Sequence, residues 1–378
     1  MKHLLDLTID DLAAELAKLG QPAFRAKQVA AWVYAKGATN FATMTDLPAA
    51  LRPELAARMA ILTGKVAARK DSADGVIKLL IEWHDGERIE TVLIPSGTAR
   101  EDTGETPATR AGILPARLTG RMPVPRAAGR ATACVSTQAG CALGCTFCAS
   151  GEGGLKRNLT AGEIVEQIFH LQQAAGRKVT HVVFMGTGEP LANYEATVGA
   201  VRAIIDPPRL GISARRVTIS TVGLPKAIRR LAAEDMPITL AISLHAPNDA
   251  LRRQIMPAAA AVPIADIVAA AQEFFQSRSR ELTLEYVLLA GVNDTNVCAD
   301  GLARIAGRLR CNVNLIRYNP VPEAPYKRPS QTAVREFADR LARLGVNVQV
   351  RRSRGADADA ACGQLRRRVG AGSEGQGQ

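Results

Sequence analysis

The chain has 378 residues, enough for two or three domains, and its hydrophobic fraction of 47% allows a large core. Aromatic residues make up only 4%, which argues against a surface built from many stacking rings. The formal net charge of +12 fits an acidic polymer as partner, although a generally arginine-rich composition would give the same charge. No stretch resembles a secretory signal or a membrane span, and three of the seven cysteines are crowded, unlike a secreted disulfide framework. We therefore expect a cytoplasmic protein with no membrane association.

Residues 1–60 predict a small helical domain. Thr8 and Asp11 form a capping box at the start of one helix, Gly20 ends that helix, and Pro22 stands near the start of a second. Basic residues recur through this domain: Arg25, Lys27, Lys36, Arg52 and Arg58. They fit a solvated face as well as an RNA-binding surface.

Residues 61–95 predict a β-hairpin linker. Val76–Trp83 and Arg88–Pro95 have strand-like composition, and the Asp85-Gly86 pair between them is a typical hairpin turn. The following segment, 96–129, is rich in Gly, Pro, Thr, Ala and Arg and has no periodicity. We interpret it as a flexible insertion on the surface.

Residues 130–365 predict an α/β domain in which strands and helices alternate. The expected strands are Ala133–Ser136, Val179–Met185, Val217–Thr221, Ile238–Leu244, Leu282–Leu288 and Val313–Arg317. Helical stretches such as Ala161–Ala175 and Ala265–Phe275 lie between them, and a last strand is expected at Val346–Arg352. About six βα units imply a parallel sheet with right-handed crossovers, hence a full or partial (β/α)6 barrel. The tail, 366–378, is basic and glycine-rich, and we expect it to be disordered.

The decisive motif is a set of three cysteines, Cys141, Cys145 and Cys148, spaced C-x3-C-x2-C on a glycine-containing loop after the first barrel strand. Iron–sulfur clusters favour such soft thiolate ligands. Three protein ligands on a four-iron cluster leave one iron open for another ligand. A structural zinc ion needs four closed ligands, and no fourth Cys or His stands at a matching distance in the sequence. A zinc site completed from elsewhere, or three inert cysteines, are the alternatives.

The chain resembles the radical S-adenosylmethionine superfamily, and within it the RlmN/Cfr family of RNA adenine methyltransferases. The resemblance covers nearly the whole chain outside 96–129. It is carried by Phe24-Arg25-Ala26-Lys27-Gln28, Glu90-Thr91-Val92, the cysteine loop, Gly186-Thr187-Gly188-Glu189-Pro190, Ser243-Leu244-His245-Ala246, Gly291-Val292-Asn293-Asp294, Tyr318-Asn319-Pro320, Arg351-Arg352-Ser353-Arg354-Gly355 and Ala361-Cys362-Gly363-Gln364-Leu365. One departure is Thr187, where the family usually has Met.

The resemblance implies two cofactors, a 4Fe-4S cluster and S-adenosyl-L-methionine, of which two molecules are used per turnover. Cys141, Cys145 and Cys148 would be the cluster ligands. The implied cofactor-binding residues stand at or after strand ends: Gly188, Glu189, Ser220, Ser243, Leu244, His245 and Asn319. Taken without the family, the Gly-Thr-Gly-Glu-Pro segment is only a tight βα turn, and a lone histidine at a strand end is more often structural.

The resemblance also implies three catalytic residues, Cys362, Cys134 and Glu90. Cys362 takes a methyl group from one S-adenosylmethionine by nucleophilic displacement. A 5′-deoxyadenosyl radical from the second molecule removes hydrogen from that methyl group, and the methylene radical adds to the adenine carbon. Glu90 removes a proton, and Cys134 attacks Cys362 to release the RNA, which leaves a disulfide to be reduced. Without the family, Cys134 and Cys362 would be two buried small hydrophobic residues.

The implied substrate is C2 of a specific adenine in 23S rRNA, and also an adenine beside the anticodon of tRNA. The N-terminal helical domain would bind RNA mainly through phosphates. A reductant such as flavodoxin or ferredoxin is required, and a monomer is expected. Two alternatives stay open: the sister reaction at C8 of adenine, which confers antibiotic resistance, and an RNA-binding iron–sulfur protein without catalysis.

Overall fold

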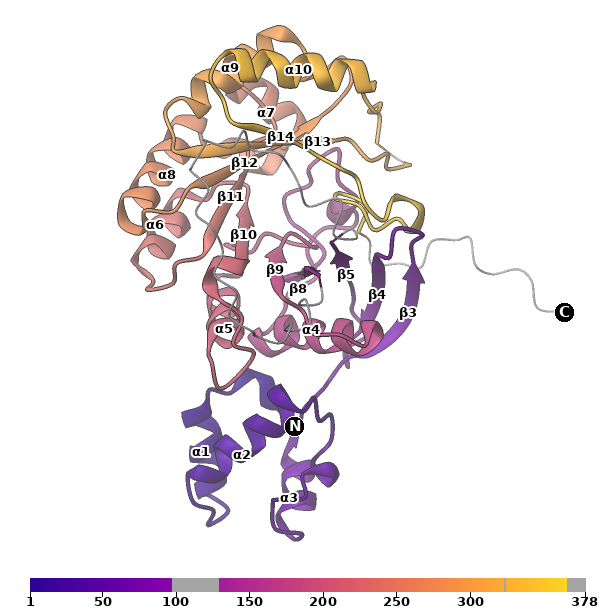
Figure 1. Ribbon diagram of the computed structural model, residues 1–378, viewed down its shortest axis with the longest axis vertical. Coiled ribbons are helices and arrows are strands. Elements are labelled where there is room, and N and C mark those ends of the chain that lie inside the picture. Colours follow the sequence, from indigo (N-terminus) through magenta and orange to yellow (C-terminus); the bar gives the residue numbers. More distant parts are fainter. Residues whose placement is uncertain (97–128, 323, 366–378) are drawn as a thin grey trace, which may run out of the picture.

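The computed structural model describes residues 1–96, 129–322 and 324–365. Two predictions fall outside these ranges, namely the insertion at 96–129, apart from its two end residues, and the tail at 366–378. The described residues form an N-terminal helical unit, an antiparallel extension and an α/β barrel domain (Figure 1).

The N-terminal unit lies at the lower end of the molecule in Figure 1. Its elements are α1 (Ile9–Ala17), α2 (Phe24–Ala30), α3 (Leu51–Arg58), β1 (Lys2–His3) and β2 (Met59–Ala60). The predicted capping box is present, because the Thr8 side chain accepts from the Asp11 amide and the Asp11 carboxylate accepts from the Thr8 amide. Gly20 adopts the left-handed backbone conformation expected after the helix. Parallel pairing of β1 with β2 joins the two ends of the unit.

The central sheet has ten strands within the described residues, in the order β14-β13-β12-β11-β10-β9-β6-β5-β4-β3. The parallel strands are β6 (Ala131–Cys134), β9 (His181–Phe184), β10 (Val217–Thr221), β11 (Thr239–Ser243), β12 (Leu282–Leu288), β13 (Cys311–Arg317) and β14 (Val348–Arg351). Every neighbouring pair from β6 to β14 is parallel. The first six match the six predicted apolar runs, and β14 matches the predicted last strand. The predicted partial barrel is therefore confirmed.

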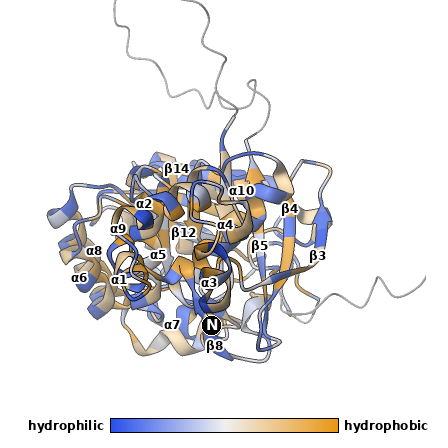
Figure 2. Cartoon of the chain, turned by 90° about the horizontal axis from the view of Figure 1, so that it is seen from below, coloured by the Kyte–Doolittle hydropathy of each residue, from blue (hydrophilic) through white to orange (hydrophobic). Residues whose placement is uncertain are grey.

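Helices connect the parallel strands and lie outside the curved sheet (Figure 1). They are α4 (Ala161–Ala175), α5 (Tyr194–Ile205), α6 (Pro225–Ala233), α7 (Asp249–Ile255), α8 (Ile264–Arg278), α9 (Asn296–Ala306) and α10 (Gln331–Arg343). Hydrophobic residues concentrate on the inner strands of the sheet, whereas β3 and the outer helix surfaces are largely hydrophilic (Figure 2). The carboxyl ends of parallel strands meet at one edge of the sheet, so the loops at those ends converge. In the part of the chain that the structure describes, no helix is both long and apolar enough to span a bilayer.

An antiparallel extension continues the sheet beyond β6. The predicted hairpin is present as β4 (Ile77–Glu82) and β5 (Arg88–Pro95), and a further strand, β3 (Lys65–Asp71), pairs with β4. β5 pairs directly with β6, with Val92 opposite Cys134 and Pro95 opposite Ala131. The two ends of the insertion are therefore adjacent, and the Ser96 amide donates to the Arg130 carbonyl at 2.7 Å. An excursion between such fixed ends leaves the position of Glu90 on β5 unaffected.

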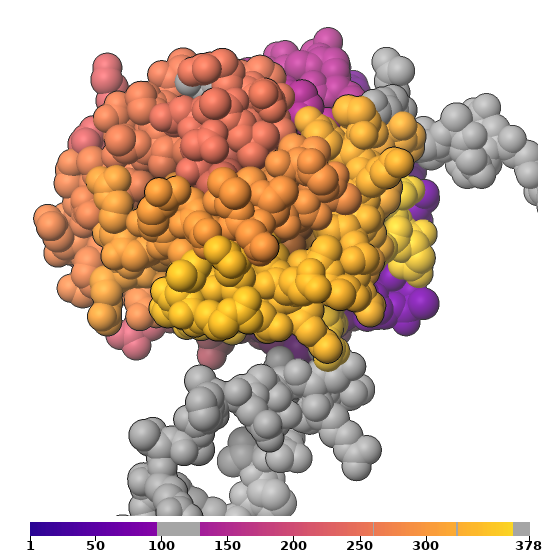
Figure 3. Space-filling view, turned by 90° about the horizontal axis from the view of Figure 1, so that it is seen from above, coloured from indigo at the N-terminus to yellow at the C-terminus, as the bar shows by residue number. Residues whose placement is uncertain are grey.

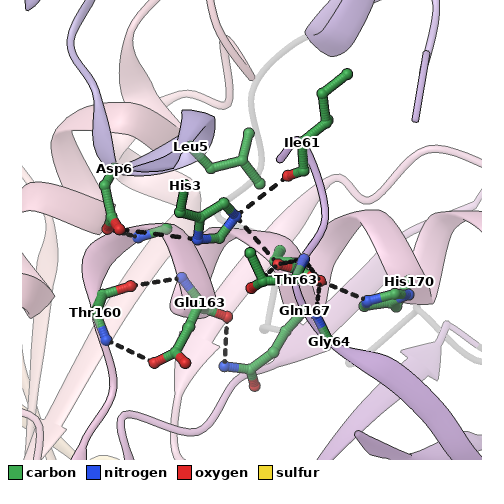
Figure 4. Close-up of polar contacts among 12 residues, drawn as sticks. His3, Leu5, Asp6, Ile61, Thr63, Gly64, Thr160, Glu163, Gln167 and His170 are labelled. Atoms are coloured by element: carbon green, nitrogen blue, oxygen red, sulfur yellow. Dashed lines mark hydrogen bonds and ion pairs between the residues drawn. The ribbon is translucent and has the colours of Figure 1, made fainter. Parts of the chain in front are cut away.

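A buried carboxylate, Glu166 on α4, ties the N-terminal unit to the barrel domain. Its oxygens lie 3.1 Å from His3 Nε2 and 3.0 Å from His170 Nε2, and they accept hydrogen bonds from the amides of Thr63 and Gly64 (Figure 4). Burial alone would raise the pKa of Glu166, but the hydrogen bonds from His170, His3 and the amides outweigh it and lower the pKa to about 2. Glu166 is therefore charged, and this charge organises the joint between the two units.

Candidate active site

Three cysteines come together on the loop that follows β6. The Cys148 amide donates to the Cys145 carbonyl at 3.0 Å, and the Thr146 amide donates to the Ile255 carbonyl at 3.0 Å, which attaches the loop to the end of α7. Gly140 is required at the start of the loop, because its φ is +81° and a Cβ there would lie 2.0 Å from the Gly154 carbonyl oxygen. Cys141, Cys145 and Cys148 are half-buried and line one cavity.

This cavity, called here the cysteine cavity, lies at the carboxyl ends of the parallel strands. The strand-end residues that line it with the three cysteines are Gly188, Glu189, Ser220, Ser243 and His245. The hydroxyl oxygens of Ser220 and Ser243 lie 3.2 Å apart on the neighbouring strands β10 and β11. Most of the remaining lining is apolar, and it includes Phe147, Val222 and Tyr318. Such a cavity with a few converging polar groups is a typical ligand site.

Glu189 places a buried carboxyl group in the wall of the cysteine cavity. Its oxygens accept from the amides of Leu191, at 3.0 Å, and Val222, at 2.9 Å, while its own amide donates to Gln138. Burial raises the pKa of Glu189 despite these hydrogen bonds. A cationic ligand group would therefore be stabilised beside it. Gly188 allows the close approach of this turn, because a Cβ there would lie 2.6 Å from Gln138 Cβ.

His245 is held in an unusual backbone conformation at the same rim. Its φ is +58°, in the left-handed region, and its Nδ1 accepts from the Val287 amide at 3.0 Å. Burial lowers the pKa of His245 to about 3, so the imidazole is neutral and its Nε2 carries the proton. His245 therefore presents a neutral hydrogen-bond donor at the cavity.

A second cavity adjoins the first and contains Cys134. This second cavity, called here the arginine cavity, is lined by Arg130, Arg351, Arg352 and Arg354 together with Cys134, Asn319 and Cys362. The cysteine and arginine cavities share four lining residues: Met185, Ile316, Arg351 and Cys362. The exposed Cys362 thus stands where the two cavities meet.

The loop that carries Cys362 is attached on both sides. The Asn319 side-chain amide donates to the Cys362 carbonyl at 3.2 Å, and the Ala149 amide donates to the Gly363 carbonyl at 2.8 Å. Upstream, the Gly355 amide donates to the Asp74 carboxylate at 3.0 Å, which fixes the loop to the turn between β3 and β4. Anchoring on both sides restricts the positions that the Cys362 thiol can reach.

Cys134, Cys362 and Arg351 are electrostatic neighbours. Burial, and secondarily proximity to Cys362, raise the pKa of Cys134 to about 12, while Arg351 opposes the change. Conversely, Cys362 is the main reason that the pKa of Arg351 is raised, against the effect of burial. Arg351 also lies 3.4 Å from the buried Glu285 carboxylate. The two cysteines that are distant in sequence therefore lie close together, with a guanidinium beside them.

Glu90 lies on β5, facing the loop that carries Cys362. It forms a buried ion pair with Lys78 at 2.8 Å, and Lys78 Nζ also donates to the Asp359 carbonyl at 3.0 Å. On the same face of β5, Val92 packs against Cys134 and Ile94 lines the arginine cavity. Glu90 itself is in the lining of neither cavity.

The structure thus brings most of the predicted site residues together. Some of them, however, lie outside the lining of the cysteine cavity. Leu244 packs its side chain into the main core and is not in the lining of the cysteine cavity. Asn319 lines the arginine cavity and contacts the Cys362 backbone, rather than lining the cysteine cavity. Thr187 is buried, and its hydroxyl has no hydrogen-bond partner among the described residues. Its side chain lies outside the lining of the cysteine cavity.

Two polar residues of the site were not identified from sequence: Lys78 and Glu285. Glu285 is a charged residue in the middle of the apolar run Leu282–Leu288, which is a signal that could have been used. Its carboxylate accepts from Asn314 at 3.0 Å and lines the cysteine cavity. Lys78 offers a similar signal, because it interrupts an apolar strand.

Comparisons with known proteins agree with this architecture. Residues 135–299 match the Radical SAM superfamily, and residues 2–61 match the ribosomal RNA large subunit methyltransferase N-terminal domain. A probable dual-specificity RNA methyltransferase RlmN of Symbiobacterium thermophilum is 44% identical and covers 96% of this chain and 91% of its own length. The protein of the same name from Thermosynechococcus vestitus is 42% identical, covering 96% of this chain and 98% of its own length.

The chain belongs to the RlmN family of radical SAM RNA methyltransferases. A solved structure, a radical SAM methyltransferase from Sphaerobacter thermophilus, superimposes with a TM-score of 0.85 at 41% identity. It covers 97% of this chain and 100% of its own length, so the RlmN-type arrangement of helical unit, extension and barrel extends over the whole match.

The site fits the two cofactors that radical SAM proteins use. Three thiols on one loop are the soft donors that an iron–sulfur cluster takes. Among the described residues, no three His, Cys, Asp or Glu side chains converge on a point that would hold one metal ion. A cluster of several irons takes each thiolate on a different iron, so its ligands stand further apart than those of a single ion. Glu189, buried in the same cavity, fits an ammonium group such as that of S-adenosylmethionine.

Burial raises the pKa of all three ligand candidates, to about 11 for Cys141 and well above the usual value for Cys145. Thiols in such an apolar setting stay protonated unless another group takes the proton. A bound metal centre removes the proton, because only the thiolate is a ligand. The RlmN-type cysteine loop can therefore hold a cluster once the metal centre has displaced these protons.

Proposed function

We propose that this protein methylates C2 of a specific adenine in 23S rRNA, and of an adenine beside the anticodon in tRNA, with Cys362 as the carrier of the methyl group. One observation carries the proposal. Cys362 is shared by the cysteine cavity and the arginine cavity, and the latter also contains Cys134. A carrier must face its donor on one side and its acceptor on the other, and Cys362 occupies such a position.

The cysteine cavity would hold both cofactors. Cys141, Cys145 and Cys148 would bind a 4Fe-4S cluster, and Gly188 and Glu189 would contact the amino group of S-adenosylmethionine. Ser220, Ser243, the Leu244 backbone and His245 would complete the cofactor contacts at the neighbouring strand ends. When bound, the cluster and S-adenosylmethionine together supply a carbon radical able to take a hydrogen atom from a methyl group.

The chain's own residues would carry the remaining steps. Cys362 Sγ accepts a methyl group by displacement and later forms a carbon bridge to the adenine ring. The adduct on the adenine ring is a radical, which would return one electron to the oxidised cluster and lose its ring proton to Glu90, while Lys78 holds that carboxylate in place. The Cys134 thiolate would then attack Cys362 Sγ as the bond between Cys362 Sγ and the bridging carbon breaks. That carbon takes up a proton to become the methyl group of the product, and a disulfide forms between the two cysteines. Reduction of this disulfide returns both thiols for the next cycle.

RNA binding would involve the N-terminal unit and the arginine cavity. The match of residues 2–61 to an rRNA methyltransferase domain supports this, as do the four arginines around the entrance to Cys134 and Cys362. The target base must leave its stack to reach a recessed thiol, which RNA loops allow. Asn319 lies beside Cys362, and its side-chain oxygen has no hydrogen-bond partner among the described residues. That oxygen would accept a hydrogen bond from the base.

The proposal includes a cytoplasmic location and an electron donor such as flavodoxin or ferredoxin. The donor supports both the radical step and, directly or through thiols, the reduction of the Cys134–Cys362 disulfide. The names of the relatives as dual-specificity RNA methyltransferases support two RNA substrates, 23S rRNA and tRNA.

Anaerobic reconstitution with iron, sulfide and methyl-labelled S-adenosylmethionine tests the proposal. Protein-free 23S rRNA and unmodified tRNA are incubated with reduced protein, and digested nucleosides are separated by mass spectrometry. The expected product is 2-methyladenosine from both RNAs. Formation of 8-methyladenosine instead would assign the chain to the sister reaction at C8. If the label reaches the protein but no methylated nucleoside forms in either RNA, the proposed function is contradicted.

A further inference from the structure

A groove lined by arginines adjoins the arginine cavity on its outer side. It lies among β13, β14 and α10, and is called here the lateral groove. Its lining consists of Arg317, Arg328, Gln331, Thr332, Val334, Arg335, Ala338, Asp339, Val350, Arg351, Arg352 and Ser353. Val350, Arg351, Arg352 and Ser353 also line the arginine cavity, so the two spaces are contiguous. The segments concerned, orange to yellow in Figure 3, lie side by side on the face seen from above.

The lateral groove carries a large excess of positive charge. Five arginines stand in its lining against one carboxylate, that of Asp339. Arg317 Nε donates to the Pro329 carbonyl at 2.8 Å, and Arg328 donates to the Ser353 hydroxyl at 3.2 Å. Neither these two nor Arg335 forms an ion pair with a carboxylate among the described residues. Burial lowers the pKa of Arg328, and the neighbouring Arg317 lowers it further because the two like charges lie close together.

The start of α10 adds to this field. Ser330 caps the helix by accepting from the Ala333 amide at 3.0 Å, and Gln331 and Thr332 of the first turn line the groove. The amino end of a helix carries a partial positive charge, which favours anions. An anionic ligand between these arginines and the helix amino end would offset the repulsion among their positive charges.

We propose that the lateral groove binds the phosphodiester backbone of the RNA strand next to the target adenosine, while the target base reaches Cys362 through the arginine cavity. This inference rests on the proposed function and extends it to the path of the substrate. Arg351 and Arg352 stand where the groove and the cavity join, so a strand whose base points toward Cys362 places its neighbouring phosphates beside them. Arginine forks suit phosphate oxygens at such sites.

The size of the groove favours a polymer over a single small anion. Its volume is about 940 Å³, and its arginines come from β13, β14, α10 and the segment before α10. One phosphate would contact only a few of these arginines. An RNA strand, which carries a negative charge at each nucleotide, would contact all of them.

The test uses a double charge reversal in the groove, Arg328→Glu with Arg335→Glu, on exposed side chains. The matched control is Arg308→Glu with Arg343→Glu, which changes the net charge equally at exposed positions outside the cavities described here. Thermal unfolding midpoints should equal that of the wild type for both variants. Binding of a 23S rRNA fragment that contains the target loop is then measured between about 50 and 200 mM salt.

The groove variant should bind at least about tenfold more weakly at low salt, and its slope of log affinity against log salt should fall by about 1.5, as expected for two lost phosphate contacts. The control variant should keep the wild-type slope. Equal slopes for the groove and control variants would overturn the inference. If the groove variant loses binding but wild-type protein yields no methyladenosine, the groove assignment stands and the proposed function fails. If wild-type protein methylates RNA and the groove variant keeps its KM for RNA, only the groove assignment fails.

Discussion

Lys78 and Glu90 form an ion pair at 2.8 Å with both side chains less than 10% exposed. The Lys78 ammonium group also donates a hydrogen bond to the Asp359 carbonyl, in the loop that carries Cys362. One lysine therefore contacts the proposed base and anchors the loop of the proposed carrier. A buried charge pair contributes little net stability compared with apolar residues, but it is costly to break from one side.

Lys78→Met should lower the free energy of unfolding by about 3–5 kcal/mol, because it leaves Glu90 buried without its cation. Lys78→Met combined with Glu90→Gln removes both charges and should recover most of that loss. Urea denaturation of the two variants and the wild type measures the difference. A double variant no more stable than Lys78→Met would show that the pair is not the source of the effect.

Cys134→Ala should stop release of the product, since no thiol remains to attack Cys362. We expect turnover to fall at least about a hundredfold and a covalent complex of protein and RNA to accumulate on denaturing gels. Cys298→Ala is the matched control, because Cys298 is equally buried but lies on α9. Release of methylated RNA by Cys134→Ala at the wild-type rate would exclude the proposed role of Cys134.

Cys145→Ser should prevent assembly of a complete cluster, because a hydroxyl is a poor ligand for iron at this position. Iron content after reconstitution should drop severalfold, with loss of the visible absorbance of the cluster. Cys311→Ser, at another half-buried cysteine outside the site, should retain both. Normal iron content in Cys145→Ser would mean that the loop does not hold the cluster.

Glu166→Gln should weaken the joint between the N-terminal unit and the barrel in a pH-dependent way. The pKa of Glu166 is lowered to about 2 in the folded state, from an ordinary 4.5. Its charge therefore stabilises the fold fully above about pH 4.5, and this contribution disappears as the pH falls through about 2. At pH 7 the variant should be less stable by about 3 kcal/mol.

Denaturation of wild type and Glu166→Gln at pH 7, 5 and 3 checks this, and the difference should shrink only at the lowest pH. Glu195→Gln, at an exposed carboxylate on α5, should differ little from wild type throughout. A constant difference at all three pH values would show that the charge of Glu166 is not what matters.

The sequence determined the elements whose signals are local. The cysteine spacing, the capping box at Thr8 and Asp11 and the apolar runs of the barrel strands depend on neighbours a few residues apart. β3 could not be found in this way, since Lys65–Asp71 is mostly exposed and charged, as edge strands often are. This segment forms a strand because its backbone pairs with that of β4.

The tertiary structure alone decided how the distant pieces of the site meet. Glu189, Ser220, Ser243 and His245 surround one cavity because they stand at the carboxyl ends of parallel strands. The order of strands in the sequence already predicts that these ends meet. That Cys362 joins two cavities, and that Lys78 links Glu90 to the loop of Cys362, depends on how the C-terminal loop packs against the antiparallel extension. Such contacts join residues far apart in the chain, and their energy comes from burial and pairing that no local pattern encodes.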